Sequence, residues 1–127
     1  MERNEAMRQL GKLFGTMLTA EAPTEINTAV ADCSRVMNEW LPGASVTCLV
    51  YSSGNFAGPV LHVPADQWRR LQGSQPYQYA SVVVVHEADG VLRVVKNRYG
   101  TPNGSDSCTL DDIMWLRNET FKFVTSV

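Results

Sequence analysis

A chain of 127 residues with a formal net charge of −2 fits one globular domain with a single buried core. Hydrophobic residues make up 44% of the chain and charged residues 19%, a balance that excludes an intrinsically disordered protein. The sequence pI of about 5.6 excludes a whole-molecule attraction to nucleic acid or to an anionic membrane. Any such binding would need a local basic patch.

The first residues, MERNEAMRQLGKLF, lack the uninterrupted apolar run of a signal peptide, and no segment approaches transmembrane length. The three cysteines, Cys33, Cys48 and Cys108, are far apart and follow no C-x-x-C spacing. An odd, sparse cysteine count without an export signal favours reduced thiols. We therefore expect a cytosolic protein with no membrane partner.

Two amphipathic helices are expected in the first third of the chain. Within residues 6–18 the apolar residues recur at three- and four-residue intervals, as on one helix face: Ala6, Met7, Leu10, Leu13, Phe14, Met17 and Leu18. After the TAEAP break, Pro23 suits the first turn of a second helix, which continues to Trp40 and ends at Pro42-Gly43. Helices joined by so short a break predict a helical hairpin over residues 1–43.

Short β-branched runs replace the helical pattern from residue 45 onward. SVTCLVY predicts a strand over residues 45–51, and VLHV predicts a second, brief strand over residues 60–63. PADQW opens a helix of about two turns at residues 64–72. Residues 77–87 predict a further strand, which is expected to be central because residues 82–85 are apolar on both faces.

The last third of the chain completes the predicted sheet. Asp89-Gly90 has the residues that a tight primed hairpin turn requires, so residues 91–96 are expected to return antiparallel. Residues 109–116 fit either a helical turn or the start of a strand, and residues 121–124 suggest a final strand. Helices first and strands afterwards predict a single α+β domain over residues 1–127. Its helical hairpin (1–43) packs on a mainly antiparallel sheet (44–127) with a short extra helix.

No set of residues has the spacing of a catalytic or metal site. His62 and His86 lie inside predicted strands, where a hydrogen-bonded structural role is expected. The enzymatic alternative is a thiol hydrolase that uses Cys48 or Cys108 with His62. Two histidines and three scattered cysteines lack zinc-ligand spacing, so we expect no catalytic residue, no metal and no cofactor.

Basic residues gather on the returning strand and its exit, at Arg93, Lys96 and Arg98, beside Tyr99. An RNA-binding surface would place such cations on phosphates and stack the aromatic ring on a base. The alternative is a solvated face that guards an edge strand, and the acidic pI favours it.

The first helix is apolar over more than a narrow stripe, because Ala6 and Leu13 lie beside the residues of the main face. Such a helix can cover the core on one side and receive another protein on the other. Methionine-rich surfaces adapt to partner helices, which favours a protein-binding role. The alternative is a terminal helix packed entirely on its own sheet.

Three segments together resemble the C-terminal head of coronavirus nonstructural protein 8, an accessory subunit of the viral RNA polymerase. KLFGTML followed by PTEINTAV is similar to the family's methionine- and leucine-rich helix and the helix after it. LHVPADQWRRLQGSQPYQYASVVVVHEADG is similar to its strand, proline-led aromatic segment, second strand and Asp-Gly turn. DDIMWLRNETFKFV is similar to its closing segment, so the resemblance spans residues 6–124 and extends to nidoviruses more broadly.

The resemblance implies a processivity-type subunit with two protein partners. In the family the methionine-leucine helix docks a small helical accessory subunit, and the matching positions here are Leu10, Leu13, Phe14, Met17 and Leu18. The segment after the second helix approaches the polymerase, and it corresponds here to Leu41, Pro42 and Val46. A hetero-oligomer in the host cell cytoplasm, within a viral replication complex, is therefore expected.

The family also has a long basic N-terminal shaft that lies along product RNA, and this chain mostly lacks it. Only Arg3, Arg8 and Lys12 would belong to its end. These residues, together with Arg93, Lys96 and Arg98, are the candidate RNA contacts. The primase-like activity ascribed to the family is not expected without the shaft, so the predicted subunit is non-enzymatic. The rival binding hypothesis is a stand-alone interaction module, of the adaptor or immunity type, that recruits its partner along a strand edge.

Overall fold

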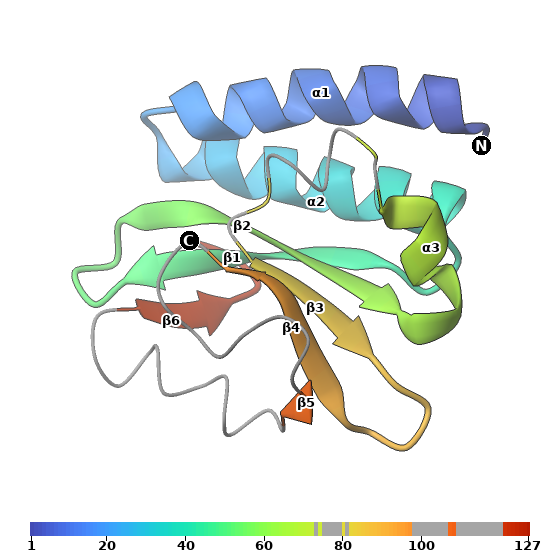
Figure 1. Ribbon diagram of the computed structural model, residues 1–127. Coiled ribbons are helices and arrows are strands. Elements are labelled where there is room, and N and C mark those ends of the chain that lie inside the picture. Colours follow the sequence, from blue (N-terminus) through green and yellow to red (C-terminus); the bar gives the residue numbers. More distant parts are fainter. Residues whose placement is uncertain (73, 75–79, 81, 98–106, 109–120) are drawn as a thin grey trace.

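The computed structural model describes residues 1–72, 74, 80, 82–97, 107–108 and 121–127, with the backbone alone at 94, 96, 97, 107, 108 and 121–123. Helices α1 (Arg3–Thr19) and α2 (Pro23–Trp40) form a hairpin that lies over one face of a sheet (Figure 1). Both helices were predicted, and α2 has the predicted bounds. The α+β class, with a helical hairpin on a mainly antiparallel sheet and a short extra helix, is confirmed.

The described part of the sheet has six strands in the order β5-β4-β3-β2-β1-β6. Their bounds are β1 (Ser45–Tyr51), β2 (Phe56–Pro64), β3 (Val82–His86), β4 (Leu92–Asn97), β5 (Ser107–Cys108) and β6 (Phe121–Val124). Strands β2 and β3 pair in parallel, and the other described pairs are antiparallel. A parallel pair needs a crossover connection. The chain between β2 and β3 includes the 3-10 turn η1 (Ala65–Gln67) and helix α3 (Trp68–Leu71), the predicted extra helix.

The main core lies between the helical hairpin and the sheet. Helix α1 contributes Ala6, Leu10, Phe14 and Met17, which follow the three- and four-residue spacing that places side chains on one helix face. From the sheet, alternate residues point toward the helices: Val46, Cys48, Val50, Leu61, Val63, Val83 and Val85. The amphipathic pattern of α1 and α2 is therefore satisfied inside the domain.

A smaller apolar cluster lies on the face of the sheet away from the main core. It consists of Leu49, Val60, Val82, Val84 and Leu92. Strand β3 contributes to both clusters, since Val83 and Val85 belong to one and Val82 and Val84 to the other. The prediction that residues 82–85 form a central strand is confirmed.

Two local predictions were wrong. The second strand begins at Phe56 and not at residue 60, because Gly58 and Pro59 pair with β1 although their residue types favour a loop. The hairpin after β3 has a three-residue loop at residues 88–90: the Glu87 N–H donates to the Val91 carbonyl and the Gly90 N–H to the Glu87 carbonyl. In this loop only Gly90 has a positive φ, whereas a two-residue type I′ turn needs one at both central residues and a type II′ turn needs one at the first. The predicted elements at 77–81 and 109–116 fall outside the described residues.

The turn that ends α2 depends on Gly43. Its φ is +88°, and a Cβ at this position would lie 2.8 Å from Cγ of the Pro64 ring. The left-handed conformation costs a residue with a Cβ about 1–2 kcal/mol, and overpacking against a stiff ring adds about 1–3 kcal/mol. We expect Gly43→Ala to lower the free energy of unfolding by roughly 2–5 kcal/mol in urea titrations.

Gly90→Ala is the matched control for this prediction. Gly90 has nearly the same φ, +87°, but nothing lies within 4 Å of the added Cβ. The control should therefore lose only the conformational part, about 1–2 kcal/mol. Equal losses in the two variants would contradict the role assigned to the Pro64 contact.

Candidate functional site

The structure separates the five docking residues predicted on α1 into core and surface. Leu10, Phe14 and Met17 are at most 1% exposed, so a partner that docks on the folded domain cannot contact them. Leu18 is 49% exposed, and Leu13 is partly buried at the edge of the core. Five helical residues correspond to a rotation of about 140°, so Leu13 and Leu18 lie on different flanks of α1.

The predicted polymerase contact after α2 is also divided. Leu41 and Val46 are buried at 0% and 5% exposure, because they close the end of the main core. Pro42 is exposed. Leu41 and Val46 are therefore not accessible to a partner of the folded domain, contrary to the prediction, whereas Pro42 is accessible.

A groove runs between α1 and α2 on the surface of the hairpin. It has a volume of about 340 Å³ and is lined by Leu13 and Thr16 of α1 and by Thr24, Glu25, Thr28, Ala29 and Asp32 of α2. Leu13 and Ala29 supply apolar lining, and the other lining residues are hydroxyl or carboxyl groups. Sequence analysis placed Leu13 in a docking surface but did not identify the α2 side of this groove.

The candidate RNA contacts do not form one basic surface among the described residues. Arg8 forms an ion pair with Glu5 on the same helix, and Arg93 forms one with Glu87 at 2.7 Å. Arg3 and Lys12 are exposed on α1, while Arg93 and Lys96 belong to β4, on the other side of the hairpin–sheet interface (Figure 1). The side chain of Lys96 and the whole of Arg98 lie outside the described residues.

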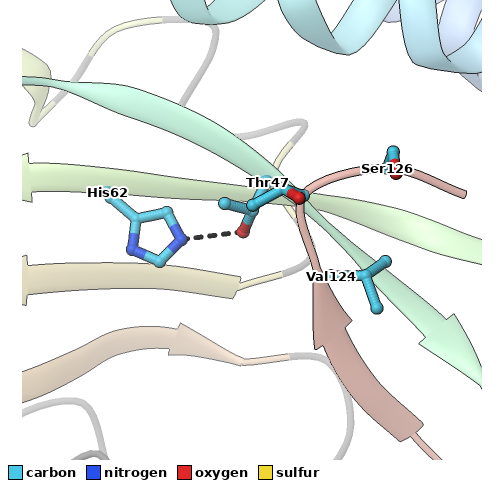
Figure 2. Close-up of a pocket in the computed structure, with 5 residues that line it drawn as sticks. Thr47, His62, Val124 and Ser126 are labelled. Carbon is cyan, nitrogen blue, oxygen red and sulfur yellow. Dashed lines mark hydrogen bonds between the residues drawn. The ribbon is translucent and has the colours of Figure 1, made fainter.

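A chain of hydrogen bonds that sequence analysis missed crosses three strands on the face away from the helices. Thr47 Oγ1 lies 2.8 Å from His62 Nε2, the contact drawn in Figure 2. His62 Nδ1 lies 2.9 Å from His86 Nε2. Thr47, His62 and His86 each follow a residue that faces the main core, so the two-residue period of a strand places them on the opposite face. This alternation is the sequence pattern that could have indicated a shared face. The contact between the two histidines also requires the parallel β2–β3 pairing, which the sequence did not reveal.

Two hollows adjoin this hydrogen-bonded chain. One, of about 520 Å³, is lined by Thr47, His62, Val124, Thr125 and Ser126 (Figure 2). The other, of about 280 Å³, is lined by Gly43, Ser45, Thr47, His62, Pro64 and His86. Residues 124–126, which line the first hollow, are followed by Val127, and Val127 is held on α2 by the Asn27 side chain. The Asn27 side chain accepts a hydrogen bond from the Val127 N–H at 2.6 Å and donates one to the Val127 carbonyl at 3.3 Å.

The electrostatics of the histidine pair favour neutral rings. Burial, and secondarily the nearby His86, lower the pKa of His62 to about 4. Burial also lowers the pKa of His86. A pKa near 4 makes His62 too weak a base to remove a proton from the Thr47 hydroxyl at neutral pH. The arrangement therefore acts as a hydrogen-bonded brace across β1, β2 and β3.

The thiol-hydrolase alternative is not supported by the described residues. Cys48 is buried in the main core, on the opposite face of the sheet from His62, so these two side chains cannot form a catalytic pair. Burial raises the pKa of the Cys48 thiol to about 11 and that of Cys33 to about 12, which disfavours the nucleophilic thiolate. The Cys108 side chain lies outside the described residues. Within the described part of the chain, no three His, Cys, Asp or Glu side chains are placed to hold a metal ion.

The strand-edge alternative meets an obstacle at β1. Strand β6 pairs with β1 only from Cys48 to Tyr51, so no described strand pairs with residues 45–47 on that side. The Val46 N–H already donates to the Ser34 hydroxyl of α2 at 3.1 Å. A peptide strand added at this edge would have to displace that bond.

Among the described residues, no helix has the length and apolar character needed to cross a membrane. Comparison with protein-family models, with curated proteins and with solved structures finds no match to this chain.

Proposed function

We propose that this chain is a non-enzymatic accessory subunit of a viral RNA-dependent RNA polymerase complex. In this proposal it binds a small helical subunit and the polymerase through the outer surface of its helical hairpin. The proposal draws on the resemblance to the head of coronavirus nonstructural protein 8. The order of helices, strands and short helix is the order that this resemblance implies.

The observation that carries the docking part of the proposal is the exposure of Leu18. About half of this side chain is accessible at the end of α1, and Leu18 does not belong to the main core cluster. Covering a leucine of this kind contributes roughly 1–2 kcal/mol to an interface. Pro42, exposed at the end of α2, is the corresponding accessible residue on the polymerase side.

The proposal predicts that Leu18→Asp weakens the complex without unfolding the chain. We expect affinity for the small helical subunit of the same genome to fall about 10- to 30-fold, as for a residue at the centre of an interface. Isothermal titration calorimetry would measure the affinity, and circular dichroism melts would show that the domain remains folded.

Thr19→Asp is the control, because it adds the same charge one position along on an exposed part of α1. Equal weakening by both variants would contradict a specific role for Leu18. A wild-type chain that binds neither the polymerase nor the helical subunit would overturn the proposed function and favour a stand-alone interaction module.

A further inference from the structure

The groove between α1 and α2 has acidic groups at both ends of its α2 wall. Glu25 and Asp32 are seven residues apart, which corresponds to two helical turns, about 10 Å along the axis and nearly the same face. Between them the wall consists of the small side chains Thr28 and Ala29. The α2 wall of the groove therefore has small side chains in its middle and a carboxyl group toward each end.

The negative charge of this groove is not neutralised inside the described part of the chain. No lysine or arginine is among the described residues that line the groove. The described ion pairs on the hairpin are Arg8 with Glu5 and Arg35 with Glu39, and neither involves Glu25 or Asp32. The position of Glu25 in the first turn of α2 suits the helix dipole, but Asp32 lies mid-helix, where the dipole offers it little.

From this pattern we infer that the groove binds a basic amphipathic helix of the partner. The small residues let a helix approach closely, and an apolar side chain of the partner packs against Leu13, which is only partly buried. Lysine or arginine residues one turn to either side of that apolar side chain lie opposite Glu25 and Asp32. The same carboxylates repel phosphates, so the groove selects a protein helix over RNA.

This inference rests on the proposed function, and it specifies the chemistry of the small helical subunit. The test compares two double variants. The groove variant carries Glu25→Gln and Asp32→Asn, and the matched variant carries Glu2→Gln and Asp66→Asn. Both variants remove two negative charges, but Glu2 and Asp66 are exposed residues that do not line the groove. Calorimetry would measure binding of the small helical subunit at low and high salt.

We expect the groove variant to bind about 10-fold more weakly than the wild type at 50 mM salt, and the difference to shrink to less than about 2-fold at 500 mM, where such contacts are screened. The matched variant should stay within about 2-fold of the wild type at both salt concentrations. Circular dichroism melts would exclude unfolding as the cause.

The remaining outcomes separate the two proposals. If the complex forms and the groove variant binds as tightly as the matched variant, the inference is overturned and the proposed function stands. If both variants weaken binding equally, the effect is one of total charge and the inference is again overturned. If the wild-type chain forms no complex, both fall.

Discussion

Replacing Phe14 and Met17 by aspartate is expected to unfold the domain. Both side chains are at most 1% exposed in the main core, beneath the outer surface of α1. Truncating one such phenylalanine costs about 3–5 kcal/mol, and burying an unpaired carboxylate costs several more. Two such substitutions together cost an amount comparable to the whole stability of a small domain, which is about 5–15 kcal/mol. Far-UV circular dichroism at 25 °C should show loss of helix and no cooperative melting transition.

Leu18→Asp on the same helix is the control, with an expected change in unfolding free energy within about 0.5 kcal/mol. The distinction matters because the sequence alone placed all three residues in one partner surface. If the Phe14 and Met17 variant remained folded and lost only its partner, the main face of α1 would be a docking surface and the core described here would be wrong.

Acid is expected to destabilise the domain through His62. Its pKa is about 4 in the folded protein, against an ordinary value of 6.5. Between these two values the unfolded chain binds more protons than the folded domain, so stability rises with pH and is lost as the pH falls from 6.5 toward 4. At 1.36 kcal/mol per pKa unit, the loss amounts to about 3 kcal/mol. His86 contributes with the same sign, because burial also lowers its pKa.

Urea titrations of the wild type and of His62→Gln between pH 7 and pH 4 would measure this effect. Carboxylates also titrate near the lower limit, so the informative quantity is the difference in unfolding free energy between the two proteins. That difference should decrease by about 3 kcal/mol across the range, since glutamine does not titrate. A difference that stays constant with pH would show that His62 is not held neutral by burial.

The helical part of the fold could be predicted because its signals are local. The spacing of apolar residues and the position of Pro23 determine where α2 begins, and Pro42-Gly43 determines where it ends. The strands were harder to delimit, since Gly58 and Pro59 read as a loop but pair with β1. Pairing across a sheet overrides local preference, and the parallel β2–β3 register brings together residues that are about twenty positions apart.

The candidate site illustrates the same limit. A three- and four-residue spacing shows that Leu10, Phe14 and Met17 share a face, but it does not say whether that face meets the core or a partner. The contact between His62 and His86 depends on strand order, which no local pattern encodes. The groove at Glu25 and Asp32 depends on how α1 and α2 lie side by side. In each case the missing information is the tertiary arrangement.

Amide hydrogen exchange of the chain, alone and mixed with the polymerase and the small helical subunit of the same genome, is the most direct test of the proposed role. The proposal predicts added protection in the complex at the end of α1 near Leu18 and along the groove wall of α2, with exchange in β2 and β3 unchanged. Unchanged exchange throughout the helical hairpin, or protection confined to the sheet face around His62, would contradict it.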